Sequence, residues 1–265
     1  TSLKNLDVRN PEILVAEDPK ATISDFVITK QGLFFVKTKN GVSSKLYRLQ
    51  SGNIEEIPIP KPAGAIYLLA KGADFDDLWI EISGWTTNEV RYKYNSEENT
   101  FTEETLYKKK SQTNYDNIIV EELEVPSHDG TLIPLSLIYH KNIQKNGKNP
   151  VLMRGYGTYA FSLTPEVDAM MMQWIDKGGI YAVTHVRGGG EKGDTWHKAG
   201  FKKTKPNTWK DFIACTEYLI EQKYTNASKI AAWSSSAGGI LIGRAITERP
   251  DLYAAAIVRV GKLNT

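Results

Sequence analysis

The sequence has 265 residues, of which 41% are hydrophobic and 24% are charged, so it can bury the core of one or two globular domains. A formal net charge of +2 argues against a nucleic-acid-binding protein, and no apolar run approaches the ~18 residues of a membrane span. The single cysteine, Cys215, excludes a disulfide within the chain. Neither a cofactor nor a metal is expected, and the composition does not decide between cytoplasm and periplasm.

The first part of the chain, residues 1–108, is predicted to be all-β. Short apolar runs alternate with turn signals such as Asn40-Gly41 and Ser51-Gly52, and strands that recur at this spacing are typical of sandwiches, barrels and propeller blades. The runs at 33–36 and 78–80 are apolar throughout, which predicts buried central strands. The predicted strands are 25–29, 33–38, 45–49, 54–59, 66–70, 78–83 and 89–94.

The pattern changes in the second part, residues 109–265. Residues 118–125 and 132–139 flank a turn and predict a hairpin, after which strands and helices alternate. The expected strands are 151–154, 180–186, 229–233 and 254–260; the expected helices are 165–177, one capped by Asn207, and 237–249. Strands that alternate with helices indicate a mostly parallel sheet flanked by helices.

The most informative motif, Ser234-Ser235-Ser236-Ala237-Gly238-Gly239, lies between a predicted strand and a predicted helix. The G-x-S-x-G elbow of α/β hydrolases needs such a sharp turn, with small neighbours that let it close around an exposed serine. Ser234 takes the place of the usual first glycine, and Gly238 fills the second. The motif therefore predicts Ser236 as a nucleophile.

At this motif the sequence resembles the prolyl oligopeptidase family, and the resemblance extends over nearly the whole chain. The matching stretches, in chain order, are GYG at 155–157, VRGGGEKG at 186–193, WHKAG at 196–200, DF at 211–212, EYLI at 217–220, SSSAGG at 234–239 and RPDL at 249–252. The resemblance implies that residues 1–108 are the last blades of a β-propeller. Residues 109–265 are then the N-terminal part of an α/β-hydrolase domain, so the chain is expected to be a fragment.

The resemblance also implies roles for individual residues in a serine peptidase that cleaves short peptides through an acyl-enzyme. Ser236 matches the nucleophile. The hydroxyl of Tyr156 and the backbone N–H of Ala237 match the oxyanion hole, where two preorganised donors stabilise the charge that develops in acyl transfer. Tyr159 falls near a position that lines the pocket for the residue before the cleaved bond.

A serine nucleophile needs a base, which in α/β hydrolases follows the serine in the chain, after an acid. The residues that follow Ser236 contain no histidine. His185 and His197 are therefore candidate substitute bases, although a structural role is the simpler expectation for both. A sheet that is cut in its middle leaves an unpaired edge strand, so a homo-oligomer that pairs through this edge is also expected.

Three other interpretations stay open. Gly188, Gly190 and Gly193 fit the dinucleotide-binding pattern G-x-G-x-x-G after a strand, although the following residues do not resemble the start of a long helix. A carboxylesterase is the second, because esters have better leaving groups than peptides and tolerate an incomplete triad. The third is a folded fragment that has no activity.

Overall fold

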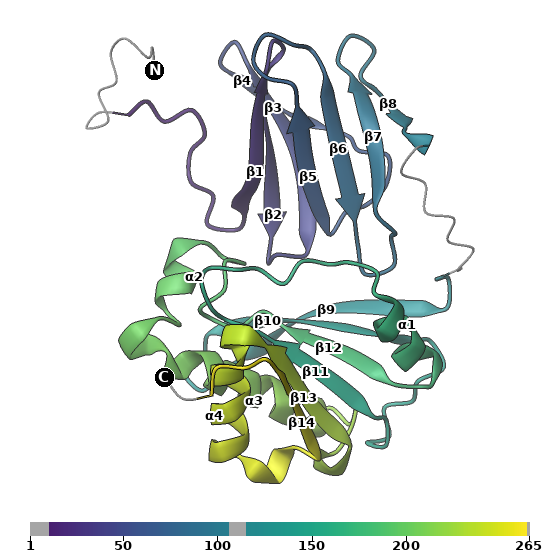
Figure 1. Cartoon of the computed structure of the whole chain (residues 1–265), viewed down its shortest axis with the longest axis vertical. Helices are drawn as coiled ribbons and strands as arrows, with labels where there is room; N and C mark the ends of the chain where they lie inside the picture. The colour runs from purple at the N-terminus through teal and green to yellow at the C-terminus, as the bar shows by residue number, and fades with distance from the viewer. Residues whose placement is uncertain (1–10, 106–114, 264–265) are drawn as a thin grey trace.

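The computed structural model describes residues 11–105 and 115–263, which form an all-β part above an α/β part (Figure 1). The boundary predicted at residues 108–109 lies outside the described residues. Within residues 11–105 and 115–263, no helix combines the length and the apolar character that a membrane span requires.

The all-β part consists of two four-stranded antiparallel sheets, in the orders β1-β2-β3-β4 and β5-β6-β7-β8. The strands are β1 (Thr22–Thr29), β2 (Gly32–Lys39), β3 (Ser43–Gln50), β4 (Asn53–Ile57), β5 (Ala65–Ala70), β6 (Leu78–Ser83), β7 (Val90–Asn95) and β8 (Thr100–Glu103). The first seven overlap the seven predicted strands. The eighth was not predicted, because only Phe101 among its four residues is apolar.

One core fills the space between these two sheets. The apolar runs predicted to be central strands lie in β2 and β6, and each of these strands pairs with a neighbour on both sides, which confirms the prediction. The turn from β3 to β4 requires residues that adopt positive φ at both of its central positions, as in a two-residue hairpin turn. Ser51 and Gly52 have φ values of 50° and 80° there. The fully buried core side chains include Phe34, Val36, Leu46, Leu78, Ile80 and Ile82.

The α/β part is built on one six-stranded sheet with the order β14-β13-β11-β12-β10-β9. Its strands are β9 (Ile118–Pro126), β10 (Leu132–His140), β11 (Val151–Gly155), β12 (Ile180–Thr184), β13 (Ile230–Ser235) and β14 (Ala255–Arg259). The last four strands are parallel to one another, whereas the predicted hairpin, β9 and β10, adds an antiparallel edge. The sheet is therefore mixed, with its parallel half beside the predicted elbow.

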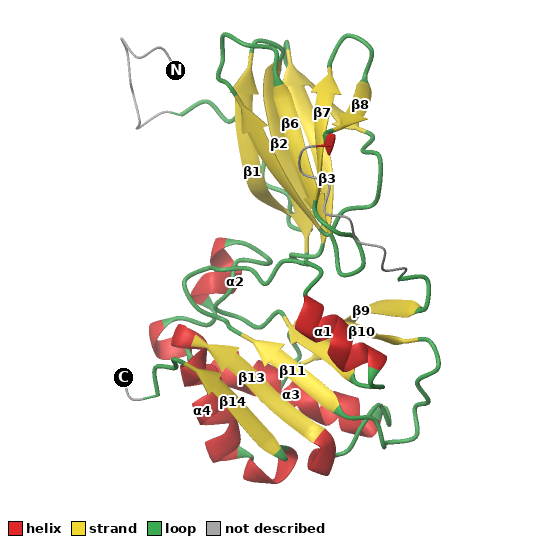
Figure 2. Cartoon of the chain, turned by 45° about the vertical axis from the view of Figure 1, so that its right-hand side comes forward, coloured by secondary structure: helices red, strands yellow, loops and turns green. Residues whose placement is uncertain are grey.

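Helices cover both faces of this sheet (Figure 2). The helices are α1 (Ala169–Asp176), α2 (Asp194–Lys198), α3 (Pro206–Glu221) and α4 (Gly239–Glu248). Met171, Met172 and Ile175 of α1 pack on one face, whereas α3 and α4 pack on the other through residues such as Phe212 and Leu241. The predicted helix led us to expect Met170, Met171 and Met172 in the core; this is confirmed for Met171 and Met172 and wrong for Met170, which is 69% exposed.

Two helix starts differ from the prediction. The helix expected from Pro165 begins only at Ala169, where Asp168 caps it by accepting a 2.9 Å hydrogen bond from the backbone N–H of Met171. Pro165 instead contacts the all-β part, because its carbonyl accepts a hydrogen bond from Ser83 Oγ (2.9 Å). The helix expected to be capped by Asn207 has Lys205 at its N-cap and Pro206 at its first position. Asn207 lies inside this helix and donates to the carbonyl of Ala199.

The two parts also contact each other through buried polar groups. The indole N–H of Trp85, which follows β6, donates to Glu122 Oε1 on β9 over 3.0 Å. Gly41, in the turn after β2, lies so close to Glu191 that an added Cβ would come within 2.7 Å of its Cγ. These contacts fix the turns of the all-β part against the loops of the α/β part.

Candidate active site

Ser236 lies at a strained turn between β13 and α4, where it begins the short 3-10 turn η4 (Ser236–Gly238). Its φ of 50° is left-handed, and its side chain is exposed, whereas Ala237 and Gly238 are buried. Such a conformation in a residue other than glycine costs about 1–3 kcal/mol and persists only where the surroundings impose it. A strained strand-to-helix turn that exposes a serine is the geometry of a nucleophile elbow.

The residues around Ser236 are small because the turn has no room. A Cβ added to Gly238 would come within 1.9 Å of Ser234 Oγ, and one added to Gly239 within 2.8 Å of the carbonyl oxygen of Lys262. Ser234, which replaces the usual first glycine, is buried, and its hydroxyl donates a 2.6 Å hydrogen bond to the carbonyl of Gly155. This bond ties the elbow to the end of the neighbouring strand β11.

Tyr156 directly follows Gly155, the last residue of β11, so this strand places Tyr156 beside the elbow. The position of a Cβ added to Gly238 is 3.0 Å from Tyr156 Cδ2, which shows that the tyrosine ring packs on the turn. On its other side the ring meets Phe161 edge-on, with ring centroids 5.7 Å apart. The structure thus brings together Ser236, Ala237 and Tyr156, which the sequence predicted to share one site.

Tyr159 lies farther along the same loop, where it and Ala160 both have positive φ (59° and 53°). Its side chain is 65% exposed, and it does not line the cavity of about 510 Å³ that opens between the all-β and α/β parts. Phe161 and His197 from the α/β part do line that cavity, opposite Tyr67 of β5.

His185, one of the two candidate substitute bases, is fully buried. Its Nε2 lies 2.9 Å from Ser136 Oγ, which donates a 2.6 Å hydrogen bond to Glu122 Oε2. Its Nδ1 faces Glu191 Oε1 at 3.7 Å and has no hydrogen-bond partner among the described residues. Burial raises the pKa of Glu122. The contacts described for His185 thus belong to a buried network between the two parts and include none with Ser236.

His197, the other candidate, holds the loop that carries Tyr159. Its Nδ1 lies 3.1 Å from the backbone nitrogen of Ala160 and 2.9 Å from the carbonyl oxygen of Gly188, to which the Ala160 N–H also donates (3.2 Å). Its ring stacks on Phe201, with ring centroids 5.2 Å apart. The contacts described for His197 do not include Ser236. Neither histidine is therefore in place as a base for this serine within the described residues.

Two charged groups near the site were not predicted. Arg187 is buried and pairs with Asp211, which also accepts a hydrogen bond from Ser127 Oγ (2.6 Å). Lys205 donates from Nζ to the carbonyl of Gly157 over 2.5 Å, and burial lowers the pKa of Lys205 to about 8. No local pattern signals either group, because their partners are distant in sequence.

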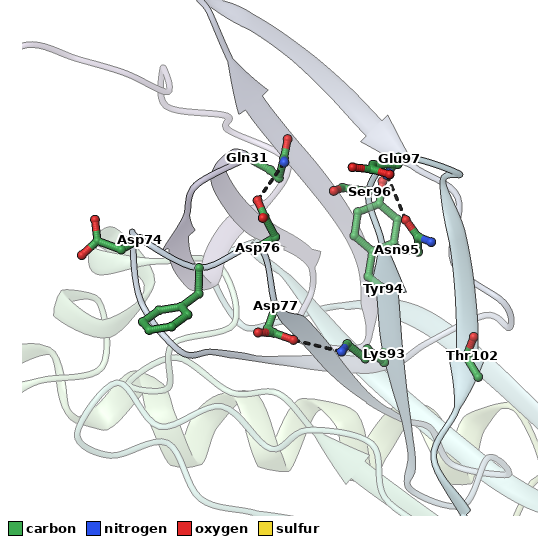
Figure 3. A pocket seen from close by; sticks show the side chains of 11 residues that line it. Gln31, Asp74, Asp76, Asp77, Lys93, Tyr94, Asn95, Ser96, Glu97 and Thr102 are labelled. Atoms are coloured by element: carbon green, nitrogen blue, oxygen red, sulfur yellow. Dashed lines mark hydrogen bonds and ion pairs between the residues drawn. The ribbon is translucent and has the colours of Figure 1, made fainter.

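A second cavity, of about 580 Å³, lies at the end of the all-β part that is remote from the α/β part (Figure 3). Several acidic side chains line it, but Asp76 accepts a hydrogen bond from Gln31 and Asp77 pairs with Lys93. No residue of the elbow reaches it. This cavity belongs to the ends of the sheets and not to the candidate site.

Comparisons with known proteins agree with the geometry of the elbow. Residues 165–265 match the model of the prolyl oligopeptidase family. A prolyl endopeptidase of Elizabethkingia meningoseptica is 34% identical over 97% of this chain and 37% of its own length. A solved prolyl endopeptidase superposes with a TM-score of 0.87 at 30% identity, over 94% of this chain and 36% of that one. Oligopeptidase B from Trypanosoma brucei, solved with covalently bound antipain, superposes with a TM-score of 0.81 at 30% identity, over 92% of this chain and 36% of that one.

The matched relatives and solved structures are named prolyl endopeptidases and oligopeptidases, so the matches define a class of peptidases. Within that class, the chain belongs to the prolyl oligopeptidase family. It spans just over a third of the length of the relatives that it matches.

Proposed function

We propose that this chain carries the nucleophile-bearing portion of a serine peptidase that cleaves short peptides through an acyl-enzyme. The observation that carries the proposal is the elbow, where Ser236 stands exposed at a φ of 50° and Tyr156 packs against Gly238. In this proposal the two four-stranded sheets are propeller blades, and residues 115–263 are the N-terminal part of an α/β-hydrolase domain.

The proposed chemistry follows from the positions of the donors. Ser236 Oγ attacks the substrate carbonyl carbon and gives its proton to a general base, and the carbonyl oxygen becomes an oxyanion. The hydroxyl of Tyr156 and the N–H of Ala237 donate to this oxyanion, and the N-terminus of α4 adds favourable electrostatics. The base then protonates the leaving amine, and water repeats the sequence to release the acid and restore Ser236.

We assign the base and its acid to residues beyond this sequence. No histidine follows Ser236 here, and the matched prolyl endopeptidase is almost three times as long as the matched region. A substitute base would have to be His197, since His185 is buried with both ring nitrogens turned to other groups. His197 would first have to release the N–H of Ala160.

Short peptides that contain proline are the proposed substrates, because relatives that match nearly the whole chain are prolyl endopeptidases. The cavity between the two parts supports this proposal, because Phe161 lines it and also contacts the ring of Tyr156. Tyr159 lies three residues after Tyr156 and is proposed to line the pocket for the residue before the cleaved bond. Activated esters give the more sensitive assay, because their leaving groups need less protonation.

A fluorophosphonate probe tests the proposal in the longer protein that supplies the base, because the probe reacts covalently with an activated serine. We expect the probe to label the purified protein at Ser236, as peptide mass mapping would show, and Ser236→Ala to remove the label. Ser235→Ala is the matched control, since Ser235 has no side-chain hydrogen bond at the N-cap of η4, and it should retain the label. Labelling that persists in Ser236→Ala would overturn the assignment of the nucleophile.

A further inference from the structure

Lys205 has an unusual setting, directly beside the loop that follows Tyr156. Its Nζ donates to the carbonyl of Gly157 (2.5 Å) and to Thr158 Oγ1 (3.2 Å). No carboxylate among the described residues pairs with it, and burial is the cause that lowers its pKa to about 8. Lys205 is half-buried, and a cation that is partly removed from water without a counter-ion is costly, so its presence needs an explanation.

The loop Tyr156–Ala160 is strained and depends on contacts from outside. Gly157, Tyr159 and Ala160 all have positive φ, and in residues other than glycine each such conformation costs about 1–3 kcal/mol. At the start of the loop, Ser234 Oγ binds the carbonyl of Gly155. At its end, the N–H of Ala160 contacts both the carbonyl of Gly188 (3.2 Å) and His197 Nδ1 (3.1 Å). Lys205 supplies the contacts in the middle, immediately after the proposed oxyanion donor.

Helix α3 does not account for this lysine. Lys205 occupies the N-cap of α3, where the helix dipole favours a negative or neutral polar side chain, and its side chain makes no capping hydrogen bond. Its aliphatic stem could be replaced by an apolar side chain of similar size. Lys205 is unfavourable at the start of its own helix but donates hydrogen bonds to a strained neighbouring loop, so its role is to stabilise that loop.

We propose that Lys205 is a positioning residue that holds the loop Tyr156–Ala160 in the geometry needed by the oxyanion donor, at a cost to the stability of the fold. The effect of Lys205 on the reaction at Ser236 rests on the proposed role of Tyr156 as an oxyanion donor. The hold on the loop is a property of the folded chain and can be measured without any reaction.

The inference predicts a dependence on pH. The other charged or titratable residues on the elements around the loop are His197 on α2, Arg187, whose backbone oxygen faces Gly157 and whose side chain pairs with Asp211, and Lys202 and Lys203 before α3. Above pH 8, loss of the charge on Lys205 replaces charge-assisted hydrogen bonds with neutral ones about half as strong. The folded-state pKa lies below the unfolded value of about 10.4, so the charged form opposes folding at pH values below 8. That penalty is relieved as the pH rises from about 8 to 10.4.

Amide hydrogen exchange tests the hold on the loop. The reporters are the N–H groups of Ala160 and Phe161, followed from pH 6.5 to 9.5 as protection relative to the unfolded chain. In the unmodified protein, protection should fall roughly fivefold as the pH passes 8, because a neutral amine binds the loop more weakly. Lys205→Met should lack this step and show protection reduced about tenfold at pH 7. Lys203→Met, which removes an exposed lysine from the same segment, should behave like the unmodified protein.

Thermal unfolding separates positioning from a general structural role. Lys205→Met should unfold at the same temperature or higher, because it removes an unpaired, half-buried cation from a helix N-terminus. Its Ser236 should nevertheless react about tenfold more slowly with the fluorophosphonate probe. Protection in Lys205→Met equal to that of the unmodified protein, or a loss of protection spread evenly over the whole fold, would overturn the inference. If the probe fails to label Ser236 at all, the proposed function fails, and the exchange data still decide the role of Lys205.

Discussion

The hydroxyl of Tyr156 is the side-chain group on which the proposed chemistry depends most directly after Ser236. Its ring is fixed by Gly238 and Phe161, and the hydroxyl has no hydrogen-bond partner among the described residues, so it is free to donate to a substrate. We expect Tyr156→Phe to slow turnover of an activated ester by about 10- to 1,000-fold, the range found for the loss of one oxyanion donor.

The same change should leave the free energy of unfolding almost unaltered, because it removes no internal hydrogen bond. Tyr47→Phe, which deletes a hydroxyl bonded to Glu56 on the all-β part, is the control and should leave turnover unchanged. A rate for Tyr156→Phe equal to that of Tyr47→Phe would exclude Tyr156 as an oxyanion donor.

The ion pair between Arg187 and Asp129 makes the stability depend on pH. Hydrogen bonds from Arg187 hold the pKa of Asp129 well below its usual range. Because the folded-state pKa is depressed, the stabilisation is fully present above the unfolded pKa of about 3.9 and is lost as the pH falls through the folded value. We expect Asp129→Asn to lower the urea midpoint at pH 7 and to reduce the difference in midpoint between pH 7 and pH 3.

Asp74→Asn is the matched control for Asp129→Asn, since Asp74 is exposed on the all-β part and forms no ion pair among the described residues. It should leave both midpoints close to those of the unmodified protein. Equal acid sensitivity in the two variants would show that the contact between Arg187 and Asp129 does not stabilise the fold.

At the scale of elements, strands β11 and β13 are joined beside the active site by the hydrogen bond from Ser234 to the carbonyl of Gly155. Ser234→Ala leaves that buried carbonyl without its donor, which typically costs about 1–3 kcal/mol. We therefore expect Ser234→Ala to lower the free energy of unfolding by this amount in urea titrations. Ser235→Ala should change it by less than about 0.5 kcal/mol. Equal stability of the two variants would mean that the bond does not tie the elbow to β11.

Most of the strands follow from local sequence patterns, and the exceptions have tertiary causes. The buried runs of β2 and β6 and the hairpin of β9 and β10 were predicted because their apolar patterns decide their burial. The start of α1 was placed too early because Pro165, a good first residue for a helix, is held by Ser83 in another part of the chain. The helix propensity of a residue at a helix end contributes less to stability than such a tertiary hydrogen bond.

The candidate site divides in the same way. Ser236, Ala237 and Tyr156 were predicted because a motif and a family resemblance mark them. Lys205 and the network of His185, Ser136 and Glu122 were not, because each depends on residues 14 to 49 positions apart that meet only in the folded chain. Their burial, which sets their electrostatics, is also invisible in the sequence.

At the scale of the whole molecule, the edge strand β14 predicts association. Within the described residues β14 pairs only with β13, and Ile257, in the middle of this strand, is 49% exposed. Exposed edges pair with other strands. Light scattering of the 265-residue chain should therefore detect dimers or larger species, and Ile257→Lys should shift them towards monomers.

Ile119→Lys introduces the same charge on β9, at the opposite edge of the sheet, and is the control for that shift. It should leave the distribution of species unchanged if β14 is the associating edge. A dilute, stable monomer of the unmodified chain would contradict the prediction.

The indole of Trp85 has a consequence for spectroscopy. It is 6% exposed and donates across the junction between the two parts to Glu122. Separation of the two parts would expose this ring to water and shift its fluorescence emission to longer wavelength. The indole N–H groups of Trp174 and Trp209 bond within the α/β part, so the emission of these two rings would not shift. The difference between the emission spectra of the unmodified protein and Trp85→Phe would therefore report separation of the two parts. Stopped-flow fluorescence could follow it without an attached dye.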